Sequence, residues 1–304
     1  MKRVLKWGLV TVGTLVAVLA AGAGIYVGVE VSAFDASLNK IYDIPAVSVS
    51  VSQDAPVLAR GRHLVMAVGA CTSSACHGSD LGGGKPIAMG PVGTFVGPNI
   101  TSRGILAVYT DSELVRLIRD GVKKDGRSLR FMPVDDFNWL PDNDMIAMVS
   151  YLRTVPGLDR ESGATVIGVL GKVLDRNDVF PIDVARRIDP SRAEHPPAPA
   201  PSPEYGSFLV RLCKGCHGAH LSGGKIPGAP ASVPIPTNLT PDASGLAGWA
   251  YDDFDRVLVE GLRRNGRRLD PFMPIESWSQ LDQTEKRALW AYLQSVPARP
   301  LGGR

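Results

Sequence analysis

The sequence has few cysteines and little net charge. Only four cysteines occur in 304 residues, and all four lie in two short segments, so none is left for a disulfide between other parts of the chain. The formal net charge is +3, and Lys2, Arg3 and Lys6 account for it. The rest of the chain is neutral, which excludes nucleic acid as a partner because such binding needs a clustered basic surface.

Charge is absent from a long stretch near the N-terminus. Residues 7–29 contain no charged side chain, and as a helix this run would measure roughly 35 Å, enough to cross a hydrocarbon core of about 30 Å. The basic residues before it predict a cytoplasmic N-terminus and export of the rest of the chain. The alternative is a cleaved secretory signal, for which Val31, Ser32 and Ala33 are a passable site. The length of the run favours a retained anchor in the lipid bilayer.

One pair of cysteines lies in a specific motif. Cys213, Cys216 and His217 form C-x-x-C-H, the attachment signature of haem c. At this spacing the thiols sit about one helical turn apart, where they can reach two vinyl groups on one edge of a porphyrin. The adjacent imidazole then lies beneath the iron. The motif therefore predicts thioether bonds at both cysteines and an iron ligand at the histidine.

The other pair forms a longer version of the motif. Cys71 and Cys76 have four residues between them, and His77 follows directly. Thr72 and two serines are tolerated in loops, so the extra residues can bulge out while Cys76 and His77 keep their places. The alternatives are a four-cysteine zinc site and a pair of disulfides. Neither requires a histidine after the second cysteine of each pair, so we expect two covalently bound haem c groups.

The two motifs belong to an internal repeat. Residues 76–78 and 216–218 are identical, and their offset is 140. Nearly the same offset relates further pairs: Asn99 with Asn238, Gly121 with Gly261, Met132 with Met273, and Tyr151 with Tyr292. The chain therefore contains two copies of a unit of about 100 residues.

Methionines at equivalent places supply candidates for the second iron ligand. A methionine thioether opposite histidine gives the raised-potential centre of an electron carrier. His77 precedes Met132 by 55 residues, and His217 precedes Met273 by 56, so we expect these two axial pairs. Met89, in a loop rich in glycine and proline, is the serious rival to Met132. The remaining candidates, which we expect in helices, are Met66, Met145 and Met148.

Local patterns predict the helices around these residues. Thr110 and Glu113 form a capping box that begins a helix over 110–119. Helices at 142–155 and 282–296 end before prolines. Shorter helices over 57–70 and 205–212 lead into the cysteine motifs.

These features resemble class I cytochrome c, in which a helix enters C-x-x-C-H and a Met-Pro loop precedes a final helix. The resemblance covers 56–156 and 205–297. Within these ranges the chain is similar to dihaem and multihaem cytochrome c subunits of membrane-bound dehydrogenases. The resemblance implies a mostly α fold, with two tandem class I cytochrome c domains after an N-terminal transmembrane helix. It also implies one haem per domain with His/Met ligation. The chain departs from the pattern in the Cys71–Cys76 spacing and in lacking a third haem domain.

The domain boundaries follow from these motifs. We expect a cytoplasmic tip and anchor at 1–33, a tether at 34–55, domains at 56–157 and 204–300, and a linker at 158–203. The end of the linker, 195–203, is a stiff proline-rich spacer. Three histidines outside the motifs are expected to face solvent: His63, His195 and His220.

The sequence predicts an electron carrier rather than an enzyme. We expect a single-pass protein of a bacterial inner membrane with its haem domains in the periplasm. Its partner would be a membrane redox complex: a dehydrogenase, a quinol-oxidising complex or an oxidase. The alternatives are a dihaem enzyme of the peroxidase or thiosulfate-oxidising type, which needs an open iron position, and a subunit in which haems only hold two domains together.

Overall fold

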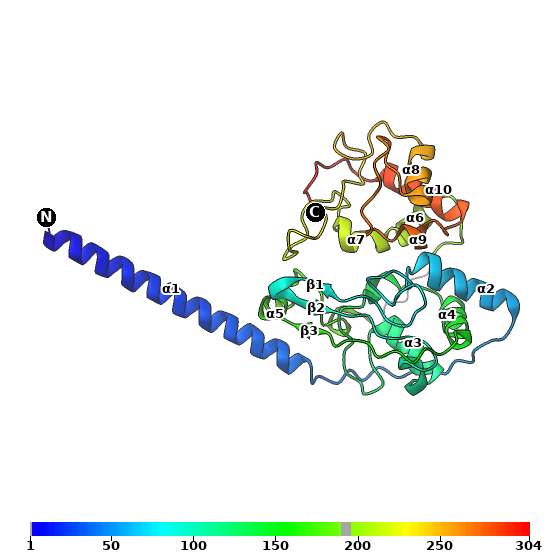
Figure 1. Ribbon diagram of the computed structural model, residues 1–304, viewed down its shortest axis with the longest axis horizontal. Coiled ribbons are helices and arrows are strands. Elements are labelled where there is room, and N and C mark those ends of the chain that lie inside the picture. Colours follow the sequence, from blue (N-terminus) through cyan, green and yellow to red (C-terminus); the bar gives the residue numbers. More distant parts are fainter. Residues whose placement is uncertain (1, 190–195) are drawn as a thin grey trace.

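The computed structural model describes residues 2–189 and 196–304. A long helix, α1 (Lys2–Ser37), leads into a first lobe (residues 41–189), and a second lobe (residues 196–304) lies above it in Figure 1. The prediction of a mostly helical chain that starts with an apolar helix is confirmed. His195, the first residue of the predicted proline-rich spacer, lies outside the described residues.

The first lobe combines helices with a small antiparallel sheet. Its helices are α2 (Ala55–His63), a π-helix (Leu64–Val68), α3 (Asp111–Asp120), α4 (Asp142–Thr154) and α5 (Val169–Arg176). The strands, in the order β1-β2-β3, are β1 (Ile87–Ala88), β2 (Gly93–Phe95) and β3 (Val166–Ile167). Ile87 pairs with Phe95, and Gly93 pairs with Ile167. Short 3-10 turns lie at Gly90–Val92, Ile105–Val108, Val134–Asp136 and Ala185–Arg187.

The second lobe repeats the helical part of the first. Its helices are α6 (Pro203–Leu209), α7 (Arg211–His217), α8 (Tyr251–Glu260), α9 (Ile275–Trp278) and α10 (Gln283–Ser295). In the sequence repeat, α8 corresponds to α3 and α10 to α4. No strand is assigned among the described residues of this lobe, so the sheet belongs to the first lobe.

Glycines allow α2 to cross closely against α4 in the first lobe, and α6 against α10 in the second. A Cβ atom at Gly61 in α2 would overlap the carbonyl of Ala147 in α4, and one at Gly206 in α6 would overlap the carbonyl of Ala288 in α10. Neither position could carry a side chain without moving the helices apart. The same backbone contact therefore organises both lobes.

The predicted helix boundaries agree with the structure where capping residues define them. The Thr110–Glu113 capping box is present, and Gly121 ends α3 with φ 67°. Asp282 and Glu285 form a second capping box at α10. The predictions for α3, α4 and α10 are thus confirmed to within one or two residues.

The predicted helix over 57–70 differs, because it contains a change of helix type. After His63 the chain continues as the π-helix, which ends at Gly69, and Ala70 adopts φ 46°. Cys71 lies ten residues after Gly61, whereas Cys213 lies seven after Gly206. The wider turn of a π-helix takes up part of such an insertion.

The far end of α1 is packed against the first lobe. Among the described residues, one helix is long and apolar enough to cross a membrane, over Lys6–Ser37. The C-terminal turns of α1 are buried. Phe34 is fully buried in an apolar cluster with Met89, Val92 and Phe95, which we call the base cluster. Ala229 of the second lobe joins this base cluster. The base cluster thus joins α1 to both lobes through buried apolar contacts.

Polar contacts reinforce the attachment of α1 to α5. Asp35 lies 2.6 Å from the Lys172 Nζ atom, and Glu30 lies 3.4 Å from the Arg176 guanidinium. The Tyr26 hydroxyl donates to Asn177 at 2.9 Å. The predicted tether is also bonded to the first lobe, since the Tyr42 amide donates to the Gly126 carbonyl at 2.8 Å. Helix α1 and the first lobe therefore form one folded unit.

Candidate haem sites

His217 is held in the orientation that an iron ligand needs. Its side chain is buried, and Nδ1 lies 2.7 Å from the Thr237 carbonyl oxygen. A carbonyl can only accept, so Nδ1 carries the hydrogen and Nε2 keeps a free lone pair. Burial lowers the pKa of His217, which the Thr237 hydrogen bond opposes. A neutral imidazole oriented by a carbonyl is the usual state of a metal-bound histidine.

His77 has the same arrangement in the first lobe. Its Nδ1 lies 2.8 Å from the Pro98 carbonyl oxygen, so Nε2 is again the free ring nitrogen. Burial lowers the pKa of this imidazole too, against the effect of the Pro98 hydrogen bond. The structure therefore presents two equivalent imidazoles, one in each lobe.

The loops that follow His77 and His217 in the chain have equivalent backbone hydrogen bonds. The amides of Gly83 and Gly223 each donate to the carbonyl of the preceding histidine at 2.8 Å. Leu81 and Leu221 both adopt φ 61°, a left-handed conformation that is costly for leucine. Strain repeated at equivalent positions indicates that the loop shape serves the histidine.

Buried asparagines hold the next segment of each loop. The Asn99 side-chain oxygen accepts from the Thr101 amide and hydroxyl, and the Asn238 oxygen accepts from Thr240 in the same way. All four side chains are nearly or fully buried. The carbonyl that binds each histidine lies just before its asparagine, at Pro98 or Thr237. The asparagine therefore fixes the acceptor that orients the imidazole.

A cavity of about 340 Å³ lies beside His217 in the second lobe. Cys213, His217 and Met273 all line it, and apolar walls include Leu246, Phe254 and Leu293. The volume falls within the range of about 300–1,000 Å³ that is usual for small-molecule and cofactor sites. Thiol, imidazole and thioether around one apolar cavity are the donor set that a covalently bound haem requires. The residues present fit that group.

The longer motif of the first lobe forms turns instead of a helix. In α7, the Gly218 amide donates to Lys214, four residues back, whereas the Gly78 amide donates to Ser73, five residues back. A hydrogen bond from outside the motif holds the extra residues in place, because the Ser74 carbonyl accepts from the Lys85 amide at 2.7 Å. The His77 amide donates to the Cys71 carbonyl at 3.0 Å, so the two ends of the motif stay together.

The methionines occupy different environments. Met132 and Met273 are partly buried against the large hydrophobic core that contains residues of both lobes. The backbone carbonyl of each accepts a hydrogen bond of 2.8 Å from the amide two residues later in the chain. Met89 lies 5% exposed in the base cluster beside Phe34, so it belongs to a different core. Met66, Met145 and Met148 pack in the π-helix and α4. The matched backbone turns favour Met132 over Met89.

Several cytochrome subunits of dehydrogenases are similar to this chain in sequence. The chain is 26% identical to the fructose dehydrogenase cytochrome subunit of Gluconobacter japonicus over 282 residues, which cover 86% of this chain and 57% of that protein. It is 34% identical over 94 residues to the gluconate 2-dehydrogenase cytochrome c subunit of Pantoea cypripedii, covering 29% of this chain and 21% of that subunit. The chain is similar to cytochrome c subunits of membrane-bound dehydrogenases.

A third relative supports the same similarity over a shorter segment. The cytochrome c subunit of the quinone-dependent alcohol dehydrogenase of Gluconacetobacter polyoxogenes is 32% identical over 107 residues, covering 33% of this chain and 23% of that subunit. No family model matches the chain. The chain thus spans little more than half the length of the fructose dehydrogenase subunit and about a quarter or less of the other two.

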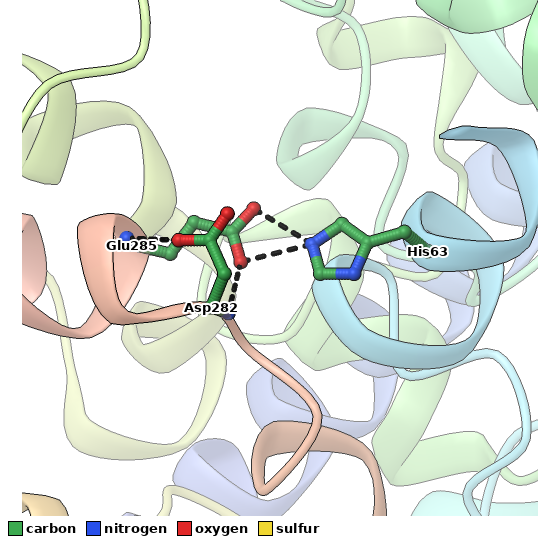
Figure 2. A group of neighbouring side chains, drawn as sticks. All are labelled: His63, Asp282 and Glu285. Carbon is green, nitrogen blue, oxygen red and sulfur yellow. Dashed lines mark hydrogen bonds and ion pairs between the residues drawn. The ribbon is translucent and has the colours of Figure 1, made fainter. Parts of the chain in front are cut away.

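The expectation that His63 faces solvent is wrong. Its Nε2 atom lies 2.9 Å from both carboxylate oxygens of Glu285, so α2 of the first lobe is joined to α10 of the second (Figure 2). Asp282 lies beside them, but it and Glu285 already exchange capping bonds with each other's amides. The group therefore serves as a link between the lobes. His220 is exposed, as predicted.

Sequence reasoning also missed two basic residues that line the cavity. Arg263 and Arg264 line it together with Met273. They correspond in the repeat to Lys123 and Lys124. A basic pair that recurs shortly after Gly121 and Gly261 is the sequence signal that could have pointed to them.

Proposed function

We propose that this protein is a membrane-anchored dihaem cytochrome c that carries electrons for a membrane-bound dehydrogenase. Two tandem class I cytochrome c domains, 56–157 and 204–300, each hold one haem c. The observation that carries the proposal is the duplicated histidine geometry: His77 and His217 each follow a cysteine pair and each donate through Nδ1 to a loop carbonyl. Two free Nε2 atoms in matched loops are expected of two haem centres.

Each residue has a defined role in this proposal. Thioether bonds form at Cys71 and Cys76 in the first domain and at Cys213 and Cys216 in the second; the axial pairs are His77 with Met132 and His217 with Met273. Haem c, when bound, supplies a one-electron iron couple. The protein fixes the imidazoles, excludes water with apolar walls, and supplies thioethers that favour the reduced state.

The anchor is proposed to remain attached in the mature protein. Phe34 directly follows Ala33, the candidate cleavage point, and it is fully buried. Cleavage there would also remove Glu30 and Tyr26, which bond to Arg176 and Asn177. Because α1 continues into the folded base of the first lobe, we infer a single-pass protein of a bacterial inner membrane with both haem domains in the periplasm.

The partner is proposed from the relatives. Cytochrome subunits of fructose, gluconate and alcohol dehydrogenases are the similar proteins, so a dehydrogenase is favoured over a quinol-oxidising complex as electron donor. An oxidase or a soluble cytochrome would receive the electrons. Copurification with the anchor intact distinguishes these donors, because each complex has a different subunit composition.

Optical titration of the detergent-solubilised protein tests the electron-carrier assignment. Two low-spin centres with a thioether-to-iron charge-transfer band, and no reaction with peroxide or cyanide, are expected of two His/Met irons. A high-spin fraction that binds peroxide would instead support the dihaem enzyme. Two redox-inactive haems would support a purely structural role.

A further inference from the structure

The two lobes contact each other reciprocally around the cysteine motifs. The 3-10 turn Val134–Asp136, just after Met132 and Pro133, packs against α7, which contains Cys213 and Cys216. Its counterpart α9, just after Met273 and Pro274, packs against the π-helix that leads to Cys71. Each methionine loop of one lobe thus touches the cysteine segment of the other.

Equivalent residues stand at the centre of these two contacts. Asp136 and Ser277 each lie four residues after the matched methionine. Ser277 is buried, and its hydroxyl oxygen lies 3.4 Å from the hydroxyl of Thr72, the residue after Cys71. In the first lobe the equivalent residue is Asp136, which carries a carboxyl group instead of a hydroxyl. The interface is therefore symmetric in shape but asymmetric in charge.

Asp136 lies close to cysteines of both motifs. Its charge contributes to raising the pKa of the Cys213 and Cys216 thiols, and also that of Cys76 in its own lobe. The Trp139 indole donates to the Asp136 carbonyl at 2.6 Å, and the Trp139 ring packs against Phe208 of the second lobe, with centroids 5.3 Å apart. These contacts hold the carboxyl group at the junction of the two cysteine motifs.

The surroundings of Asp136 contain charges of both signs. Burial raises its pKa to about 8, and Asp135 on the same turn adds to the rise. Arg211 and Lys214 on α7 oppose it. Among the protein side chains, Asp135, Arg211 and Lys214 are the charged groups that act on Asp136, and cysteines bonded to haem as thioethers would carry no charge.

We propose that Asp136 is a proton-linked control on the second haem centre, an inference that rests on the proposed dihaem function. When that centre receives an electron from its redox partner, the carboxylate takes up one proton from solvent, and on oxidation it releases that proton. A carboxylate close to an iron centre stabilises the oxidised form, which carries one more positive charge. Next to burial, Asp136 is the main influence on Cys213 of the second centre, whereas it is the smallest of the influences on Cys76 of the first. The potential of the second centre should therefore depend on pH more strongly than that of the first.

Spectroelectrochemical titration of the detergent-solubilised full chain tests this. In the natural protein, the midpoint potential of the second centre should fall as pH rises through about 8, towards a limit of one proton per electron, and that of the first centre should change less. Asp136→Asn should remove that dependence and make the same potential more positive at alkaline pH, with little change at acid pH. Asp136→Ser, which installs the residue found at Ser277, should do the same.

Asp135→Asn is the matched control, because it removes the same charge one residue away and should leave most of the pH dependence. The pH dependence persisting in both Asp136 variants, with two haems bound, overturns the inference and leaves the proposed function intact. A natural protein with fewer than two haems overturns the proposed function itself. A variant that loses haem is replaced by the other, since Asn and Ser differ in size and both remove the charge.

Discussion

Nε2 of His63 lies 2.9 Å from both carboxylate oxygens of Glu285, and this contact joins the first helix of one lobe to the last helix of the other. The Glu285 side chain is 2% exposed and that of His63 is 25% exposed. Glu285 also accepts from the Asp282 amide in the capping box of α10. A single buried carboxylate therefore supports both a helix end and the contact between lobes.

His63→Ala should weaken the protein because Glu285 would remain buried with one partner fewer. Leaving a buried polar group without a partner costs about 1–3 kcal/mol. Denaturant unfolding measures the loss. His220→Ala, at an exposed histidine, should change the free energy of unfolding by no more than about 0.5 kcal/mol. Equal effects of the two substitutions would contradict the linking role.

Met273→Ala and Met132→Ala should each abolish one thioether-to-iron charge-transfer band. Met89→Ala should keep both bands, because Met89 packs in the base cluster with Phe34 and Val92. It should instead lower stability by about 2–5 kcal/mol, the usual cost of truncating a buried methionine to alanine. Optical spectra and unfolding curves of the three variants separate ligation from packing. Loss of a band in Met89→Ala would reassign the ligand of the first haem.

Gly206→Ala should destabilise the second lobe, because a Cβ atom there would overlap the Ala288 carbonyl. Overpacking of this kind costs about 1–3 kcal/mol. Gly215→Ala is a suitable comparison, since it lies in α7 with nothing within 4 Å of its added Cβ. There alanine should be neutral or slightly stabilising. Thermal unfolding checks both, and an unaffected Gly206→Ala protein would mean that the helices do not cross as described.

Phe34→Ala should lower the stability of the first lobe by about 3–5 kcal/mol, the cost of truncating a buried phenylalanine. Val29→Ala, five residues earlier on the exposed part of α1, should have little effect on the lobes. Unfolding of both variants in detergent measures the difference. If Phe34→Ala were as mild as Val29→Ala, the C-terminal end of α1 would be a free tether, and cleavage after Ala33 would leave the first lobe intact.

Local sequence signals predicted the parts of this fold that depend on local chemistry. The capping box at Thr110 and the left-handed glycine at Gly121 define α3, and both are encoded within a few residues. The loop around His77 follows its sequence repeat, because the same glycines and asparagine recur around His217. The positions of the histidines within their loops were in this sense available from the sequence.

Contacts between lobes were not predictable in this way. His63 has no local pattern that indicates Glu285, which lies 222 residues away. The base cluster draws Phe34, Met89 and Ala229 from three distant segments, and each alone is an ordinary apolar residue. The π-helix after α2 arises from an insertion that only the comparison of Gly61–Cys71 with Gly206–Cys213 exposes. Such features depend on tertiary packing, which periodicity does not encode.

The most direct test is the intact mass of the full chain, purified from a host that matures c-type cytochromes and then denatured. Covalent attachment survives denaturation, so the account predicts the mass of the polypeptide plus two haems. Cys216→Ser with Cys213→Ser should remove one of them and leave the other on Cys71 and Cys76. A natural chain that carries fewer than two haems after denaturation, or zinc bound at these cysteines in the native protein, would contradict the central claim.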